Sequence, residues 1–146
     1  MNEKSLKGFV FKKEEIEKIL SAQPIGGKQM LEPLKGLSLE HGLPFKILED
    51  HETVNEAEIH RTEGDLWCAL QGEVVFTHGG ELVNPRVKVR KDGIADENEL
   101  LAKEIAGGTE VVLKPGDWLW IPAGTPHQHS CATTARLMII KIPSVT

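Results

Sequence analysis

The feature that most constrains the fold is a series of short apolar segments after Pro44, separated by turn residues. The segments are rich in β-branched and aromatic side chains, and each is too short for a helix of ordinary length. The predicted strands lie at residues 45–49, 56–60, 66–70, 73–77, 86–90, 110–114, 118–122 and 135–142. Many short strands at such spacing predict an all-β sandwich or small barrel.

One helix is predicted before the strands. Residues 11–22, FKKEEIEKILSA, carry apolar side chains at helical spacing with lysine and glutamate between them. Pro24 and the glycines after it end this helix, and one further helical turn is expected near residues 31–34. We therefore predict a single domain, in which an N-terminal helical extension over residues 1–42 packs on a barrel of residues 43–146.

A long connection, residues 78–109, interrupts the series of strands. Besides the strand at residues 86–90, it contains a turn at residues 91–93 and a predicted helical turn within residues 97–105. Long insertions in compact domains are often lids or binding loops. An insertion that only covers a sheet edge is the alternative, and the sequence leaves both open.

Composition excludes several classes of protein. The formal net charge is −5, and the basic residues are scattered among acids, which argues against nucleic acid as a partner. The apolar runs are far shorter than the roughly 18 residues of a membrane span. The N-terminus is charged and lacks the apolar core of a secretory signal. Two cysteines, Cys68 and Cys131, are too few for a disulfide framework, so we expect a cytoplasmic protein.

Metal-ligating residue types gather in residues 58–72, EIHRTEGDLWCALQG. Residues two apart on a strand face the same side, so Glu58 and His60 reach into the same space. In the next strand Asp65 and Trp67 share one face, and Leu66, Cys68 and Leu70 point the other way. A hairpin that turns Asp65 toward His60 would bring three donor side chains together.

A second segment, GDWLWIPAGTPHQHS, covers residues 116–130. It reads as a turn, a strand and a rigid loop, after which His127 and His129 lie two apart on one face, shared with Cys131. Two histidines on one strand face are a modest metal signal alone. They become a stronger one beside the first segment.

These two segments resemble the two motifs of the cupins, small barrels of the double-stranded β-helix or jelly-roll type. In the first motif Glu58 stands for the first histidine, His60 for the second, and Asp65 for the glutamate, while Gly72 closes it. Glu52 stands where an opening glycine is usual. The residues that match the second motif are Gly116, Pro122, Gly124 and His127, with Cys131 at its asparagine position.

The resemblance implies a divalent metal held by Glu58, His60, Asp65 and His127. Two imidazoles and two carboxylates suit Fe, Mn or Ni and do not exclude Zn. Without Glu58, the remaining ligands form a two-histidine, one-carboxylate set with open positions. His129 is then a ligand, an orienting donor or a substrate contact. The alternative is a cupin that has lost its metal. Against it, Glu58 and Asp65, which replace the usual histidine and glutamate, can both coordinate a metal.

Two functions follow from the resemblance. In the first, the metal acts on a small organic molecule in the barrel, in dioxygenase, isomerase or lyase chemistry, with Glu58 or His129 as proton shuttle. In the second, a non-catalytic module binds or senses a sugar or organic acid, so enzymatic activity stays open. A structural cupin with a dry barrel is a third alternative. Imidazoles must be neutral to coordinate, so metal should be lost below about pH 5–6.

The tryptophans and one cysteine complete the predictions. Trp67 and Cys131 are expected to line the substrate cavity, because they share faces with the ligands. Trp118 and Trp120 are expected to pack in the core or between subunits. The resemblance further implies a homodimer that binds a small molecule, and the charge and hydropathy described above predict neither nucleic acid nor a membrane as partner.

Overall fold

The structure is a computed structural model, and it describes residues 7–145. The first six residues of the predicted extension lie outside this range. Two helices and twelve strands make up the described chain. Their bounds are α1 (Lys13–Leu20), β1 (Gly27–Met30), α2 (Leu34–His41), β2 (Phe45–Val54), β3 (Ala57–His60), β4 (Glu63–Gln71), β5 (Val74–His78), β6 (Glu81–Leu82), β7 (Arg86–Val89), β8 (Ala95–Ala102), β9 (Ile105–Ala106), β10 (Thr109–Leu113), β11 (Trp118–Ile121) and β12 (His127–Pro143).

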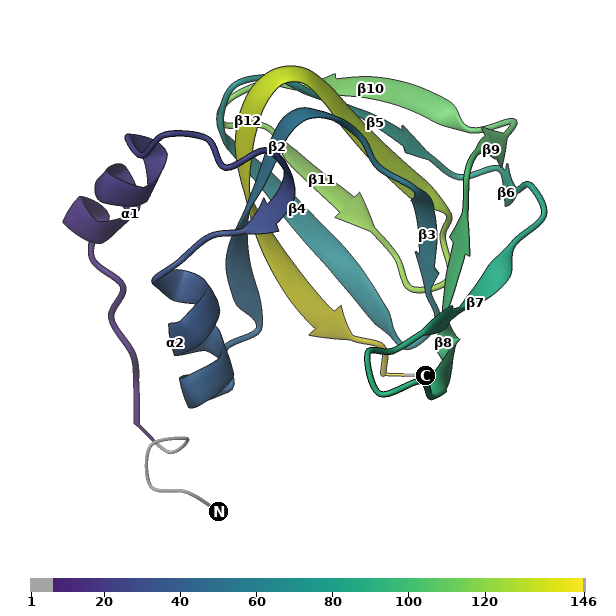
Figure 1. Cartoon of the computed structure of the whole chain (residues 1–146), viewed down its shortest axis with the longest axis horizontal. Coiled ribbons are helices and arrows are strands. Elements are labelled where there is room, and N and C mark those ends of the chain that lie inside the picture. The colour runs from purple at the N-terminus through teal and green to yellow at the C-terminus, as the bar shows by residue number, and fades with distance from the viewer. Residues whose placement is uncertain (1–6, 146) are drawn as a thin grey trace.

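The strands form an antiparallel sheet that curls into a barrel (Figure 1). β12 is its longest strand, with 17 residues, and it pairs in turn with β3, β5, β2 and β4. β3 continues the sheet to β8 and β7, whereas β4 pairs with β11 and β5 pairs with β10. The predicted all-β jelly-roll barrel with an N-terminal helical extension is confirmed.

A bulge in β12 lets this one strand serve both halves of the barrel. The register of β12 against β2 shifts between Cys131 and Thr134. Gly72 lies against this bend with φ 73°, and a Cβ there would stand 2.1 Å from the carbonyl oxygen of Thr134. The glycine that closes the first motif is therefore required by the close approach of two backbones.

Two apolar clusters stabilise the fold. The inner one fills the barrel and contains Trp67, Phe76 and Leu137. The outer one lies between the N-terminal extension and the outside of β2, β12 and β4, where Leu34 and Ile19 pack with Ile47, Leu70 and Met138. α1 and α2 accordingly lie on one side of the barrel (Figure 1).

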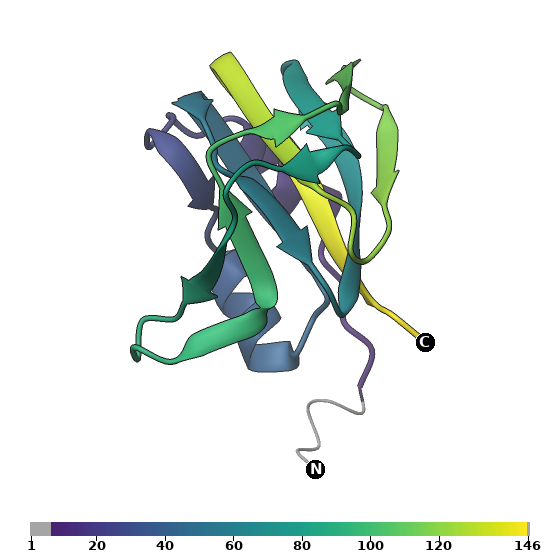
Figure 2. The same cartoon turned by 90° about the vertical axis from the view of Figure 1, so that its right-hand side faces the viewer.

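The insertion differs from its prediction in one element. Residues 97–105, predicted to contain a helical turn, fall largely in the strand β8, which pairs with β3 on one side and β7 on the other. The helical prediction is wrong because pairing with β3 supplies long-range backbone hydrogen bonds that local propensity does not register. The β7–β8 hairpin projects from the barrel (Figure 2).

Two further predictions concern the packing of Trp118 and Trp120 and the absence of a membrane-spanning segment. Trp118 is 60% exposed and Trp120 is 48% exposed, so their predicted packing in the core is wrong. Both side chains lie on the outward face of β11, because alternation turns Leu119 and Ile121 toward the barrel. Neither helix in residues 7–145 has the length and apolar character that a membrane crossing requires.

Candidate metal centre

Three strands bring the predicted ligands to one place inside the barrel. β3 carries Glu58 and His60 on the same face, β4 carries Asp65, and β12 carries His127. His127 is the cross-strand partner of Glu58, so the second motif meets the first directly. A short turn joins β3 to β4, but the predicted hairpin is not formed, because β3 pairs with β12 and β8 whereas β4 pairs with β11 and β12. Asp65 nevertheless lies beside His60.

The ligand atoms of these residues converge. Those of Glu58, His60 and His127 all lie within 4.8 Å of one another. The Nε2 atom of His60 is 3.3 Å from Oε2 of Glu58, and the Nε2 atom of His127 is 3.9 Å from the same oxygen. Asp65 is not in this group but lies beside its two histidines: its Oδ2 atom is 3.4 Å from Nε2 of His60 and 3.3 Å from Nε2 of His127.

Three of these atoms are buried and lack a hydrogen-bond partner. Among the described residues, the buried side-chain atoms without a partner are Nε2 of His60, Nε2 of His127, Oδ2 of Asp65 and Nε1 of Trp67. A buried polar atom left unpaired is costly, so such groups are rare unless an ion or water satisfies them. Three unpaired donor atoms that face a common point fit a metal ion.

Each of the four side chains is held from behind. Nδ1 of His127 donates to the carbonyl oxygen of Thr125 at 3.0 Å, and Nδ1 of His60 contacts the carboxylate of Glu99 on β8. Protein metal sites orient imidazoles in this way, by hydrogen bonds to the ring nitrogen that does not coordinate. The contacts behind the carboxylates are made by lysines: Lys141 Nζ lies 2.7 Å from Oδ1 of Asp65, and Lys28 Nζ lies 3.3 Å from Oε1 of Glu58.

The charges of the cluster are strongly coupled. Burial opposes a charge on His60, but contacts with the carboxylates of Asp65, Glu58 and Glu99 outweigh it and raise the pKa of His60 to about 11. Burial likewise opposes charge on the carboxylates of Glu58 and Asp65, yet the facing histidines and lysines lower the pKa of both. At neutral pH the metal-free cluster therefore holds two carboxylates and a protonated His60, a cation that a metal ion can replace.

His129 lies on the same strand as His127 but outside this cluster. Its Nδ1 atom is 2.5 Å from Oδ2 of Asp50 and 2.9 Å from Nδ2 of Asn55. Asp50 is fully buried, and His129 is 4% exposed. The ring of His129 also packs against Trp67, with 5.2 Å between ring centroids. The structure thus separates His129 from the four predicted ligands.

The two residues predicted to line a substrate cavity both belong to the inner apolar cluster. Trp67 is 3% exposed, and its indole nitrogen is unpaired. Cys131 is buried, and its Sγ atom lies 3.2 Å from the carbonyl oxygen of Glu73. Their role toward a substrate stays a prediction.

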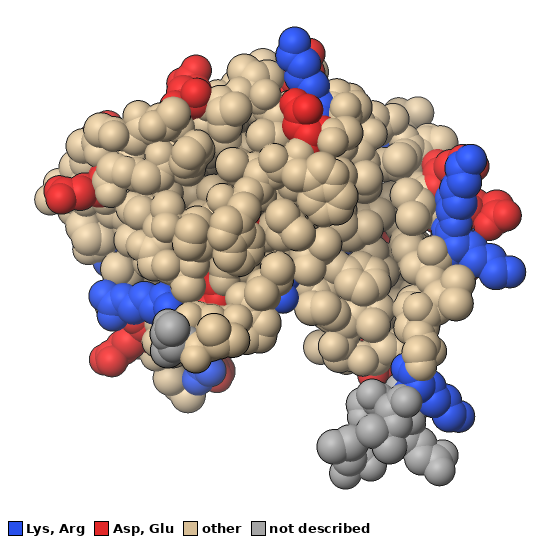
Figure 3. Space-filling view, turned by 180° about the vertical axis from the view of Figure 1, so that it is seen from behind, with Lys and Arg blue, Asp and Glu red and all other residues tan. Residues whose placement is uncertain are grey.

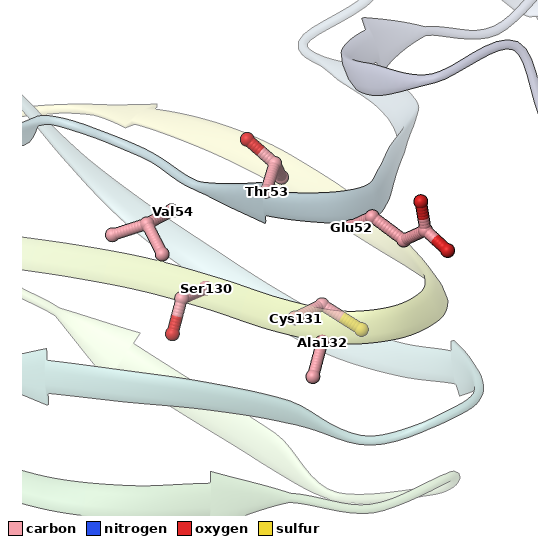
Figure 4. Close-up of a pocket in the computed structure, with 6 residues that line it drawn as sticks. All are labelled: Glu52, Thr53, Val54, Ser130, Cys131 and Ala132. Atoms are coloured by element: carbon pink, nitrogen blue, oxygen red, sulfur yellow. The ribbon is translucent and has the colours of Figure 1, made fainter.

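Surface grooves lie elsewhere on the molecule. One of about 420 Å³ lies over the paired residues of β2 and β12 next to the bulge, and it is lined by Glu52, Thr53, Val54, Ser130, Cys131 and Ala132 (Figure 4). None of the four converging side chains lines this groove. It is therefore separate from the candidate metal centre.

Sequence reasoning missed three residues that support the site, Lys141, Lys28 and Glu99, and also Asp50, which holds His129 beside it. Two carried a signal: Lys141 shares an inward face with Leu137 and Ile139 in an otherwise apolar strand, and Asp50 follows Leu48 in the same way. A charge on an inward-facing position marks a buried partner. The other two, Lys28 and Glu99, come from segments distant in sequence, and no local pattern points to them.

Comparisons with known proteins support the fold. No protein-family model matches the chain, and no curated protein sequence matches it. Among solved structures it is similar to hydroquinone 1,2-dioxygenase from Sphingomonas sp. TTNP3 with 4-hydroxybenzoate bound, at 13% identity and a TM-score of 0.50, over 88% of this chain and 72% of that one. It also matches the Drosophila melanogaster CENP-C cupin domain at 13% identity and a TM-score of 0.46, over 67% of this chain and 59% of that one.

The chain spans 56–64% of the length of the three CENP-C structures that it matches. At these identities the likeness concerns the fold alone. The curled antiparallel sheet, with a long bulged strand shared by both halves, agrees with it. The chain has a jelly-roll barrel fold similar to that of hydroquinone 1,2-dioxygenase.

Proposed function

We propose that this protein is a metal-binding cupin that holds a divalent ion, Fe, Mn, Ni or Zn, through Glu58, His60, Asp65 and His127 and binds a small organic molecule at it. One observation carries the proposal. The Oδ2 atom of Asp65 lies 3.3–3.4 Å from Nε2 of His60 and of His127, all three atoms are buried without a hydrogen bond, and contacts on the far side of each side chain fix its position. An apolar barrel core would not leave these three atoms unpaired without a ligand.

The donor set decides what chemistry the site can support. A divalent ion bound there supplies a Lewis acid or a site for dioxygen activation. Two carboxylates offset the ion's charge, which suits hard or borderline metals. Glu58 acts as a ligand in this proposal because its Oε2 atom approaches both imidazoles. His129, held by Asp50 and set apart from the cluster, is then the residue left to hold or move a proton.

Metal content of purified variants tests the site. Protein purified without added metal should contain close to one divalent ion per chain, and His60→Ala and His127→Ala should each lose it. His41→Ala, on α2 and far from the cluster in the fold, is the matched control and should keep it. Equal metal content in all four proteins would overturn the proposed site.

A second variant separates the two roles assigned above. Glu58→Gln should weaken metal binding, because it removes a charged ligand, whereas His129→Gln should leave the metal content unchanged. The opposite result, with metal lost from His129→Gln and kept in Glu58→Gln, would exchange the roles of these residues. Circular dichroism of both variants checks that the barrel is folded.

The non-catalytic alternative is distinguished with the metal-loaded protein. Oxygen consumption against a panel of diols, enols and keto acids would identify a dioxygenase, and conversion without oxygen uptake would identify an isomerase or lyase. Thermal stabilisation by such a compound, with no turnover, would identify a module that binds or senses it. His127→Ala should abolish each of these responses.

A further inference from the structure

β11 is the exposed edge strand of one half of the barrel. Within residues 7–145 it pairs only with β4, which leaves the backbone groups on its other side without a strand partner. Its outward side chains, Trp118 and Trp120, are 60% and 48% exposed. An open edge beside two exposed tryptophans does not suit a monomer in water.

The tryptophans continue an apolar surface across three strands. Cross-strand partners on β12, β4 and β11 form two rows. One row is Ile140, Leu66 and Trp120, and the next is Met138, Cys68 and Trp118. Trp120 also covers Gly64, where a Cβ would stand 2.3 Å from its ring. We call Trp118, Trp120, Leu66, Ile140 and Ile142, the last of which is opposite Gly64, the tryptophan face. Cys68 is 8% exposed and Met138 packs in the outer cluster, so neither adds to this face. None of the residues of the tryptophan face is charged, and the molecule seen from behind shows a wide area without charged residues (Figure 3).

The other edges of the large sheet are protected. Natural edge strands commonly carry charged residues, which oppose pairing with another chain. β7 carries Arg86 and Lys88, β10 carries Glu110, and β1 carries Lys28. β11, with the sequence WLWI, is the edge strand of this sheet that has no charge and no proline. Among the edge strands of this sheet, β11 therefore lacks the charged residues that would oppose pairing with another chain.

The β11 sequence is complementary to itself. Residues opposite each other in an antiparallel pair face the same side, so outward Trp118 must meet an outward residue of the second strand. Centred on Leu119, two copies of β11 place Trp118 opposite Trp120 of the second copy, and the reverse. Cross-strand aromatic pairs of this kind stabilise a sheet.

We propose that two copies of this chain form a homodimer by antiparallel pairing of β11, with the tryptophan faces joined around a two-fold axis. This surface lies on the outside of the barrel, so the proposal does not depend on the metal site. A two-fold axis requires a self-complementary patch, and the alternation of Trp118 and Trp120 about Leu119 provides one. The net charge of −5 disfavours an anionic lipid surface as the occupant.

The exposed area sets the expected affinity. A tryptophan buries about 150–250 Å², so the exposed parts of Trp118 and Trp120 amount to on the order of 200 Å². Leu66, Ile140 and Ile142 extend this area, but it stays below the roughly 800 Å² per partner of a standard interface. We therefore expect a reversible dimer with a dissociation constant of about 1–100 µM.

Sedimentation equilibrium measures this association directly. Over a range from about 1 µM to about 300 µM, the unmodified chain should pass from monomer to dimer. Trp118→Lys should raise the dissociation constant at least about tenfold, because it places a charge against Trp120 of the second copy. Val89→Lys, at a 63% exposed position on the β7 edge, is the matched control and should leave it unchanged.

Disulfide trapping tests the register. In a Cys68→Ala background, which removes the thiol opposite Trp118, the variants Trp118→Cys and Trp120→Cys are prepared separately. Opposite strand positions lie within disulfide reach, so the oxidised mixture should form a covalent dimer while each variant alone stays monomeric on a non-reducing gel. Mixing preserves one tryptophan pair at the interface.

Three results would overturn the proposal. These are a monomer at every concentration, a dimer that Trp118→Lys leaves intact, and trapping that is as efficient for the single variants as for their mixture. Binding of the monomer to phosphatidylcholine vesicles, without self-association, would overturn it in favour of a lipid surface. Circular dichroism and metal content of each variant show whether a loss of association reflects unfolding instead, and Trp118→Phe, which keeps an apolar ring, should then restore the dimer.

Discussion

At the scale of the residue, three side chains of the candidate metal centre each have one polar atom fixed by a contact with the protein and a second polar atom without a hydrogen bond. Each imidazole is fixed through Nδ1 and leaves Nε2 free, and Asp65 is fixed by Lys141 through one oxygen and leaves the other free. This arrangement orders the ligand side chains before any ion binds, so ion binding does not have to offset the conformational entropy of ordering them. The substitutions at the motif positions therefore keep a competent donor set.

Metal binding should release a proton from His60. The pKa of His60 is raised to about 11, so at pH 7.5 its imidazole is protonated in the metal-free protein and neutral in the metal complex. Apparent affinity should therefore rise about tenfold per pH unit between about pH 6.5 and 10. Calorimetry of Zn²⁺ binding in two buffers with different ionisation enthalpies should show release of about one proton per ion. A heat that does not depend on the buffer would contradict protonation of His60.

Glu52 occupies the motif position at which cupins usually have glycine, and its backbone explains the preference. Its φ is +49°, in the left-handed region that costs a non-glycine residue about 1–2 kcal/mol. Its side chain is exposed and lies 3.8 Å from His51. Glu52→Gly should therefore stabilise the fold by about 0.5–1 kcal/mol in urea unfolding.

The matched control for this prediction is Glu110→Gly, an exposed glutamate in the regular strand β10. Because φ is not positive there, glycine gains nothing in the folded state and loses chain entropy, so this variant should be less stable by about 0.5–1 kcal/mol. Destabilisation by Glu52→Gly of the same size as in the control would show that the backbone at residue 52 is not strained.

At the scale of the element, one side chain joins the N-terminal extension to the barrel. Arg136 on β12 is 3% exposed and lies 3.0 Å from Oε1 of the fully buried Glu49. Its other guanidinium nitrogens donate to the carbonyl oxygens of Leu20 and Ala22, at and beyond the end of α1. The extension is thus held by directed hydrogen bonds as well as by the outer apolar cluster.

Arg136→Met should destabilise the protein by about 3–5 kcal/mol, because it leaves Glu49 buried without a counter-charge. Proteolysis should then cut between α1 and β1 faster than in the unmodified chain. Arg90→Met, which removes an exposed 3.6 Å pair with Asp92, should cost less than about 0.5 kcal/mol. Replacing Glu49 by Leu in the Arg136→Met chain should restore much of the lost free energy of unfolding. A double variant no more stable than Arg136→Met would argue that the buried Glu49 charge does not cause the destabilisation.

At the scale of the whole molecule, the candidate metal centre ties together β3, β4 and β12, and β12 itself pairs with both halves of the barrel. An ion bound there crosslinks segments from residue 58 to residue 127. Since the unfolded chain cannot present these four ligands together, binding should stabilise the folded state.

Removal of metal should therefore lower the melting temperature. At a free metal concentration of about 100 times Kd, binding contributes about 2.7 kcal/mol, which corresponds to roughly 5–10 °C for a chain of this size. Differential scanning calorimetry with and without chelator measures the difference. His127→Ala should melt at the same temperature in both conditions, and a chelator effect that persists in this variant would place the metal elsewhere.

The sequence by itself determined the strand segments, the motif spacing and which side chains share a face. Alternation along a strand is a local property, so Glu58 and His60, or Asp65 and Trp67, could be assigned to common faces without coordinates. The resemblance of the two segments to the cupin motifs then predicted that His127 lies opposite them, and it also predicted the jelly-roll fold.

Only the tertiary structure decided which distant side chains complete these local patterns. Lys28 and Glu99 reach the cluster from β1 and β8, and Trp118 and Trp120 are exposed because β11 is an edge strand with no further strand beside it. The physical reason is common to these cases: strand order and burial depend on pairing between segments far apart in the chain, which no local periodicity encodes.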